Sequence, residues 1–237
     1  MKNSVTIVIP CYNEQNYIYN TLWMISRQED IDGVRILVAD GGSTDRTIEF
    51  VSKASDDFKN LRIELIDGGR VATGRNKGAF HVKTPYVLFM DADSILMEED
   101  IIKLTLNESD NFDLITCKQK SLTTSDFKSV LVYKLFNLIR KIMPQTFSTG
   151  CYFFISVEKF NELGGFDETL DNSEDFWLSK QIPKSKFKIL NRYVGQDNRR
   201  FKKMGYWKFI KLILLNYWHR NNINWFKKDV GYWEPYE

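Results

Sequence analysis

Short apolar runs alternate with amphipathic stretches over the first ninety residues. The runs at 5–9, 35–39, 61–66 and 86–90 are rich in β-branched and aliphatic residues, which predicts four strands. Between them, apolar positions recur at helical spacing, and polar residues such as Asn13 and Ser43 or Thr44 are suited to begin those helices. This alternation predicts an α/β protein with a Rossmann-like, mostly parallel central sheet flanked by helices.

The same patterning continues less regularly to the end of the chain. It predicts helices at 98–108, 127–143 and 157–163 and strands at 113–117, 151–155 and 187–190, with a further helix opening at Asn172. The helix at 127–143 is amphipathic, with lysines and other polar residues on one side. Its apolar stripe consists of Phe127, Leu131, Leu135, Leu138 and Ile142.

Carboxylates follow the predicted strands where they end. Asp91-Ala92-Asp93 comes directly after the apolar run that closes at Met90, and Asp40 follows the second strand. Ligands bind outside the carboxyl ends of the strands in open α/β sheets. Two acids one residue apart suit a divalent cation, since Mg²⁺ typically takes one or two carboxylates together with substrate phosphates. The alternative is an Asp-rich turn that caps the next helix, and these residues alone leave both interpretations open.

Composition narrows the class of protein. The chain has 237 residues, 43% hydrophobic and 27% charged, which indicates a globular chain of one large domain or one domain with an appendage. A net charge of +2 gives no case for a nucleic-acid partner. Three cysteines suggest free thiols in a reducing compartment. With no secretory leader and no apolar run of spanning length, we expect a cytoplasmic protein.

Two phosphate-binding glycine motifs are missing. The first strand is followed by Pro10, Cys11 and Tyr12 instead of GxGxxG, and GxxxxGK[ST] does not occur. These absences argue against a Rossmann dehydrogenase and a P-loop ATPase.

Seven segments in order resemble the family-two inverting glycosyltransferases with the GT-A fold. They are IVIPCYNE, VADGGSTDRT, GGRVATGRNKGA, VLFMDADS, an apolar segment ending in Thr149-Gly150, FNELGGFDE and NSEDFWLS. The resemblance covers about residues 4–205. It implies a GT-A domain at 1–205, with a helical basic extension at 206–237.

The resemblance also assigns a nucleotide-sugar site. It implies nucleobase and ribose contacts in the first two segments, a segment beneath the nucleotide in the third, and the Asp-Ala-Asp motif beside the phosphates. The residues so matched are Pro10, Tyr12, Glu14, Asp40, Gly41, Gly74, Arg75, Asn76, Asp91 and Ala92. Asp93, with Asp91, is matched to the metal pair that holds Mg²⁺ or Mn²⁺.

The implied reaction is sugar transfer from a nucleotide-diphosphate donor to an acceptor hydroxyl, with inversion. Glu174 and Asp175 match the family's acidic pair, and Asp175 is the expected general base, with an ordinary pKa of about 3.9. Acidic residues also favour the start of a helix, and that structural interpretation holds at the same time. Two alternatives remain: a nucleotidyltransferase, and a catalytically silent sugar-nucleotide-binding protein.

The chain departs from processive members of the family after this pair. A Gln-x-x-Arg-Trp motif is replaced by Asp197-Asn198-Arg199-Arg200-Phe201. Arg199 and Arg200 either reach the donor diphosphate from a loop or are surface charges of a basic segment.

The last part of the chain is basic and aromatic. Residues 201–226 mix lysines with tryptophans and leucines, a composition that suits a helix in a membrane interface. With the helix at 127–143, it predicts peripheral attachment to the inner face of a membrane and suits a lipid-linked acceptor, the other option being a glycan. The alternatives for this segment are packing on its own domain or on a second copy in a homodimer.

Overall fold

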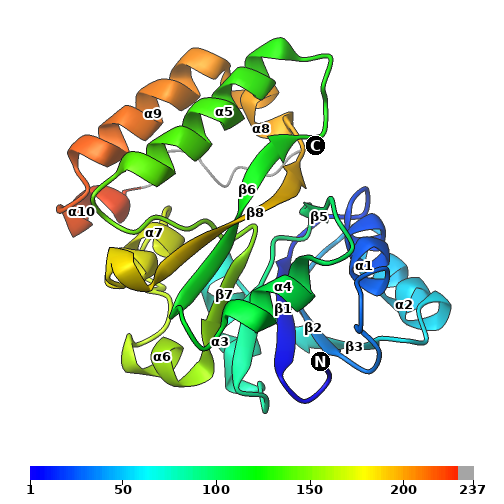
Figure 1. Ribbon diagram of the computed structural model, residues 1–237. Helices are drawn as coiled ribbons and strands as arrows, with labels where there is room; N and C mark the ends of the chain where they lie inside the picture. The colour runs from blue at the N-terminus through cyan, green and yellow to red at the C-terminus, as the bar shows by residue number, and fades with distance from the viewer. Residues whose placement is uncertain (229–237) are drawn as a thin grey trace.

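The computed structural model describes residues 1–228, without the side chain of Arg200, and is built on one eight-stranded sheet (Figure 1). The order across the sheet is β3-β2-β1-β4-β7-β6-β8-β5. The strands are β1 (Val5–Cys11), β2 (Arg35–Asp40), β3 (Arg62–Asp67), β4 (Tyr86–Phe89), β5 (Ile95–Leu96), β6 (Leu114–Ser121), β7 (Phe153–Ser156) and β8 (Phe187–Gln196).

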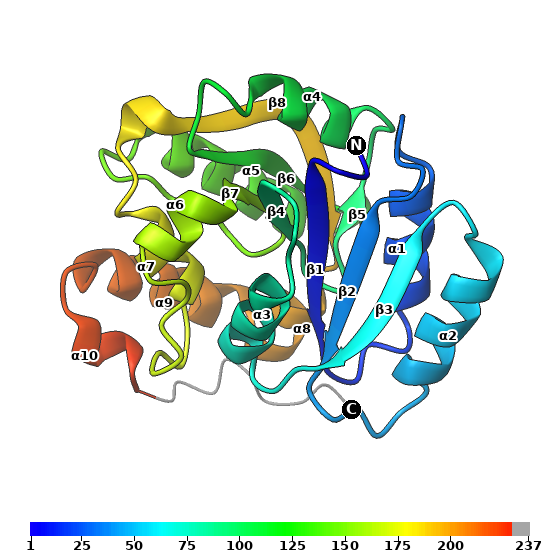
Figure 2. The same ribbon diagram turned by 90° about the horizontal axis from the view of Figure 1, so that it is seen from below.

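Helices connect these strands and cover the sheet. They are α1 (Ile18–Ser26), α2 (Thr47–Asp57), α3 (Val71–Phe80), α4 (Ile101–Glu108), α5 (Phe127–Ile142), α6 (Val157–Glu162), α7 (Glu174–Ser179), α8 (Arg199–Met204), α9 (Tyr206–Trp218) and α10 (Ile223–Phe226). Figure 2 shows α1 and α2 on one side of the first three strands and α3 on the other.

The sheet is parallel in its first half and mixed in its second. β1 pairs in parallel with β2 and β4, and β2 with β3, as the alternation of strand and helix predicts. β7 then runs antiparallel between β4 and β6, and the short β5 runs antiparallel to β8. The sequence pattern indicated neither β5 nor the full length of β8, because β5 is only two residues long and polar residues interrupt β8.

The central strands are buried on both faces. Ile7 packs towards α1 and α2, its neighbour Val8 packs towards α3, and both are fully buried. Successive residues of a strand point to opposite faces, so a strand covered on both sides needs a continuous apolar run. This explains why the sequence shows apolar runs here rather than alternation.

Two predicted helix starts are wrong. α1 begins at Ile18 instead of Asn13, and α2 begins at Thr47 instead of Ser43 or Thr44. Asn13 has a positive φ of 54°, and its side-chain oxygen accepts a hydrogen bond from Thr44 N at 2.8 Å. Asn13 N in turn donates to Ser43 Oγ at 2.9 Å. These polar residues therefore join two loops at the carboxyl ends of β1 and β2.

The helix α5 carries its apolar stripe on the outside. The five side chains of that stripe, from Phe127 to Ile142, are 49–75% exposed. The side that faces the sheet contains Ser129, Tyr133 and the fully buried Arg140. Arg140 donates hydrogen bonds to the carbonyl oxygens of Cys117 and Phe147 and to Thr116 Oγ1. The helix is thus amphipathic as predicted, and Arg140 of its polar side points inward while Lys134 and Lys141 are exposed.

The predicted C-terminal extension is described as far as Lys228, and residues 229–237 lie outside the described part. α9 contains no buried residue, whereas Phe226 of α10 packs on Phe176 and Trp177. Between residues 1 and 228 no helix combines the length and apolarity needed to cross a bilayer.

The contact between α3 and β1 yields a stability prediction. A Cβ at Gly78 would lie 2.2 Å from Val8 Cγ1, so Gly78→Ala should lower the unfolding free energy by about 1–3 kcal/mol through overpacking. At Gly74, one turn earlier, the nearest atom would be Pro10 Cβ at 3.4 Å. Gly74→Ala should leave stability unchanged or raise it by up to about 1 kcal/mol, as for alanine inside a helix. Chemical denaturation measures both free energies, and an equal loss of unfolding free energy in the two variants would contradict this account of the packing.

Candidate active site

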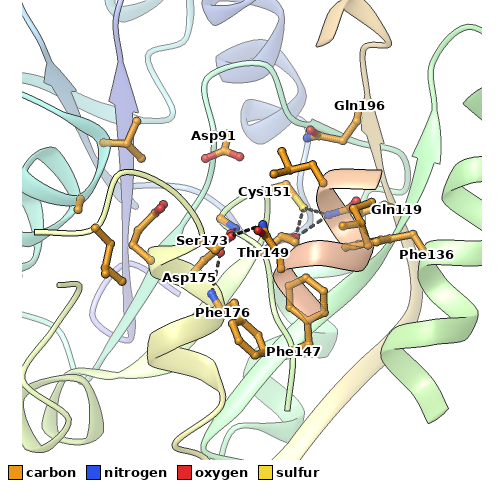
Figure 3. Close-up of a pocket in the computed structure, with 18 of the residues that line it drawn as sticks. Asp91, Gln119, Phe136, Phe147, Thr149, Cys151, Ser173, Asp175, Phe176 and Gln196 are labelled. Atoms are coloured by element: carbon orange, nitrogen blue, oxygen red, sulfur yellow. Dashed lines mark hydrogen bonds between the residues drawn. The ribbon is translucent and has the colours of Figure 1, made fainter. Parts of the chain in front are cut away.

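A cavity of about 1140 Å³ lies at the carboxyl ends of β1, β2 and β4 (Figure 3). Most of the residues matched by motif line this cavity, although they are far apart in the sequence. They are Pro10, Tyr12, Glu14, Gly41, Arg75, Asp91, Ala92, Asp93, Glu174, Asp175 and Arg199.

Arg75 joins two carboxylates at the floor of the cavity. Its side chain is only 2% exposed, and Nη1 donates to Glu174 Oε1 at 2.5 Å while Nη2 donates to Asp91 Oδ1 at 2.6 Å. Burial works to lower the pKa of Arg75, but the charges of Asp91 and Glu174 outweigh it and the pKa lies above its ordinary value. The guanidinium thereby holds the end of β4 against the start of α7.

Gly150 makes the Arg75 contact possible. A Cβ at this position would lie 1.8 Å from Arg75 Nη2 and 3.0 Å from Asp91 Oδ1. Only glycine leaves room for the guanidinium here. The backbone N–H of Gly150 also donates to Asp175 Oδ2 at 2.9 Å. Gly150 therefore lies between Asp91 and Asp175, and Figure 3 shows both carboxylates in the same part of the cavity.

Asp175 is a carboxylate with an unusual environment. Its Oδ1 accepts from Phe176 N at 2.7 Å, and its Oδ2 accepts from Gly150 N. Burial, reinforced by the charge of Glu174 and opposed by Arg75, raises the pKa of Asp175 to about 7. The ordinary pKa expected from sequence is therefore corrected by the structure. A carboxylate with a pKa near neutrality is matched to general-base chemistry at physiological pH.

A second arginine, Arg199, binds two further acids that line the cavity. Arg199 Nη2 donates to Glu14 Oε1 at 2.6 Å and to Asp93 Oδ2 at 2.8 Å, and its guanidinium lies 4.4 Å from the centre of the Tyr17 ring. Burial raises the pKa of Glu14 to about 7, with Arg199 opposing the shift and Asp93 adding to it. Of the two interpretations of Arg199, the surface charge is therefore wrong. The side chain of Arg200 lies outside the described residues.

The acids at the end of β4 fit a hard divalent cation. In the described part of the chain, no three Asp, Glu, His or Cys side chains converge on one point to hold a metal ion. Asp91 and Asp93 thus offer at most two carboxylates, which is the number Mg²⁺ typically takes when phosphate oxygens complete its shell.

Among the predicted site residues whose side chains are described, three do not line the cavity. Asp40 accepts hydrogen bonds from Gly42 N and from the backbone and hydroxyl of Ser43, so it holds the loop after β2. Gly74 packs α3 against β1. Asn76 donates to Phe166 O and Glu168 Oε1, which ties α3 to the segment before α7.

Sequence reasoning missed several residues of the cavity. Gln119 of β6 donates to Thr149 Oγ1 and to Cys151 Sγ, and Phe136, Phe147 and Phe176 form an aromatic wall. The aromatic residues were visible only as ordinary core positions. The pair Thr149-Gly150 belongs to one of the matched motifs, and a glycine beside a predicted site is a signal that another group approaches its backbone closely.

Comparisons with known proteins place this geometry in a family. The model of "Glycosyl transferase family 2" matches residues 6–164, more than half of the chain. A hyaluronan synthase from Pasteurella multocida is 25% identical over 235 residues, which cover 95% of this chain and 24% of that protein. The chain therefore spans about a quarter of the length of this relative.

Solved structures share the fold at low identity. Residues 1–349 of Staphylococcus aureus TarS, in complex with UDP-GlcNAc, superpose with a TM-score of 0.62 at 17% identity, over 83% of this chain and 59% of that one. The mannosyltransferase PcManGT from Pyrobaculum calidifontis, in complex with GDP-Man and Mn²⁺, gives 0.67 at 21% identity, over 90% and 65%. These are GT-A glycosyltransferases, so the predicted fold is confirmed.

The buried ion pair yields a prediction on stability. Arg75→Met would leave the carboxylate of Glu174 buried without its cation, and we expect the unfolding free energy to fall by about 3–5 kcal/mol. The double variant Arg75→Met/Glu174→Gln should lose less, because the buried charge of Glu174 is then absent and Asp91, the other partner of Arg75, is 35% exposed.

Arg46→Met is the matched control for this measurement. Arg46 pairs with Glu49 on the surface, where both side chains are more than 60% exposed, and the change should stay within about 0.5 kcal/mol. A double variant as unstable as the single one in urea denaturation would refute the charge explanation.

Proposed function

This chain belongs to Glycosyl transferase family 2, and on that premise we propose that it is an inverting glycosyltransferase. The proposed reaction moves a sugar from a nucleotide-diphosphate donor to an acceptor hydroxyl. One observation carries the proposal: Asp175, with a pKa of about 7, borders the same cavity as the Asp91 and Asp93 pair. A base and a cation site in one cavity are the two requirements of such a transfer.

The donor is expected at the carboxyl ends of β1, β2 and β4. Gly41 and Tyr12 line this end, and Gly41 has no side chain to obstruct a nucleoside. Relatives of known structure support the class of ligand, since TarS was solved with UDP-GlcNAc and PcManGT with GDP-Man and Mn²⁺.

Asp93 and Asp91 would hold the divalent cation, with Asp93 as the main ligand. When bound there, Mg²⁺ or Mn²⁺ supplies positive charge that stabilises the diphosphate as it leaves. Arg199 already rests against Asp93, so its guanidinium is close enough to add a second positive charge to the same phosphates.

Asp175 acts as the base in this proposal. Its carboxylate takes the proton of the acceptor hydroxyl while the hydroxyl oxygen forms a bond to the anomeric carbon. The bond from that carbon to the diphosphate oxygen breaks on the opposite face, and a nucleoside diphosphate leaves with the electron pair. The two backbone N–H groups from Gly150 and Phe176 hold the carboxylate in place. Arg75 positions it indirectly through Glu174.

Replacement of the base tests the proposal. Asp175→Asn should lower the rate of transfer by about 10²–10⁴-fold while nucleotide-sugar binding is retained. In the wild-type protein, kcat/KM should rise about tenfold per pH unit up to a pH of about 7 and then level off, because the base works when deprotonated. Coupled measurement of released nucleoside diphosphate gives both results.

The folding of the variant serves as a control. Because the folded state binds the Asp175 proton more tightly than the unfolded state, ionisation of this group costs stability as the pH rises from about 4 to about 7. Asp175→Asn should therefore melt at a higher temperature than the wild type at pH 8.

Pyrophosphate as the released product would indicate a nucleotidyltransferase. Full donor binding without any turnover in the wild type would indicate a silent binding protein.

The cation site has its own test. With Mn²⁺ and a nucleotide sugar at about 100 times its Kd, the wild type should gain about 2.7 kcal/mol of stability. Asp93→Asn should lose the Mn²⁺-dependent part of this thermal shift across a panel of UDP-, GDP- and TDP-sugars. Asp56→Asn, which changes an exposed carboxylate on α2, should keep it. A metal-dependent shift that survives Asp93→Asn would remove Asp93 from the site.

A further inference from the structure

The cavity does not end at the acidic residues. It continues as an apolar arm between α5 and α9, and this arm accounts for many of its lining residues. Phe136 and Ile139 line it from α5, and Leu212 and Ile213 line it from α9. Both helices lie at the same end of the molecule (Figure 1). No step of the proposed sugar transfer uses this arm.

The apolar arm begins directly beside the proposed base. Phe176 follows Asp175 in the chain, its ring centre lies 5.4 Å from that of Phe147, and Phe147 lies 5.4 Å from Phe136. Figure 3 shows Phe147 and Phe176 on the side of Asp175 away from Asp91. A molecule whose hydroxyl reaches Asp175 from this side would place its remaining part between apolar walls.

The outer faces of the same two helices are also apolar. Trp207 and Trp218 of α9 are 85% and 79% exposed, and the exposed stripe of α5 runs from Phe127 to Ile142. Large exposed apolar patches of this kind mark surfaces that contact a membrane or another protein. Tryptophan is typical of the boundary between lipid and water, where its ring is partly buried.

Charge identifies the partner. In sequence, α5 and α9 contain lysines but no aspartate or glutamate. Lys134, Lys141, Lys208 and Lys211 are exposed beside the apolar stripes. Basic residues that alternate with aromatic and aliphatic ones match a surface of anionic lipid, whose headgroups attract lysine and whose chains accept tryptophan and leucine. A second protein copy would bring the same positive charge to the contact and would be repelled.

We propose that the acceptor is an amphiphile, with its hydroxyl-bearing head at Asp175 and its apolar chain in the arm between α5 and α9. The outer faces of these helices rest on the anionic lipid surface from which the acceptor enters. This inference rests on the proposed function, because it names the class of acceptor for that same base.

Photolabelling tests the arm directly. The probe is a dodecyl glucoside with a diazirine at the end of its chain, because its head carries the hydroxyls that the proposal requires, and the labelled residues are found by mass spectrometry. We expect labels on the inner wall, at Ile139 and Ile213, that unlabelled dodecyl glucoside removes and methyl glucoside does not. Labels confined to the outer stripe, at Leu131 and Leu135, would overturn the proposal.

Two neighbouring residues of α5 provide a matched pair of variants. Ile139 lines the arm, whereas Leu138 belongs to the outer stripe and is 53% exposed. Ile139→Trp should fill the arm and reduce inner-wall labelling by about tenfold, a change worth about 1.4 kcal/mol of binding. Leu138→Trp should leave it unchanged. Equal labelling of both variants, with melting temperatures that show both to be folded, would contradict the inference.

Flotation tests the outer surface. The full chain should float with vesicles of phosphatidylcholine and phosphatidylglycerol and remain behind with phosphatidylcholine alone. Leu135→Glu should reduce flotation, whereas Glu49→Gln on α2 should not. Equal recovery of the wild type with both kinds of vesicle would refute the claim that the outer faces of α5 and α9 bind anionic lipid.

The donor thermal shift separates this inference from the proposed function. A wild type that binds no nucleotide sugar refutes the proposed function and, with it, the acceptor assignment. A wild type that binds donor but leaves the inner wall unlabelled refutes only the amphiphilic acceptor.

Discussion

The buried guanidinium of Arg75 is the interaction on which the site depends. It lies between Asp91 at the end of β4 and Glu174 at the start of α7, two carboxylates that would otherwise repel each other in a desolvated position. Its own position follows from the backbone, since α3 approaches β1 closely at Gly78 and Gly150 leaves space for the guanidinium. The close packing at these two glycines thus determines where the charges of Arg75, Asp91 and Glu174 meet. Asp175, next to Glu174, is brought to the cavity by the same arrangement.

The short helix α8 connects the two chemically different ends of the cavity. Arg199 at its first position bonds to Glu14 and Asp93, beside the expected donor phosphates. Two residues later, Phe201 packs on Tyr133 of α5 and Phe209 of α9. One turn of helix therefore contacts both the acidic cluster and the walls of the apolar arm. A movement of Arg199 away from Asp93 would therefore also displace Phe201 and change its packing against α5 and α9.

The sequence predicted what is local, and it missed what depends on distant partners. The parallel half of the sheet followed from apolar runs, and the place of Asp91 and Asp93 followed from the end of a strand. Asp175, which lines the same cavity, was matched only through the family resemblance. Asn13 was mistaken for a helix cap because the same amide can cap a helix or bridge to a loop 31 residues away. The pKa of Asp175 was unpredictable because burial by remote residues sets it. The sequence identified the apolar stripe of α5 correctly but did not show that the stripe faces outward. The inner side of the helix carries Arg140, whose guanidinium donates to carbonyl oxygens of β6 and of a loop.

The lack of any buried residue in α9 has a consequence for how the chain opens. Burial of apolar surface is the main contribution to folding free energy, and a helix that buries little adds little to it. Such a segment belongs to the least protected class in amide exchange, separating from the rest at a fraction of the global cost. The amide protons of α9 should then exchange more slowly when another surface covers the helix. Their exchange rate therefore measures how much of α9 is covered.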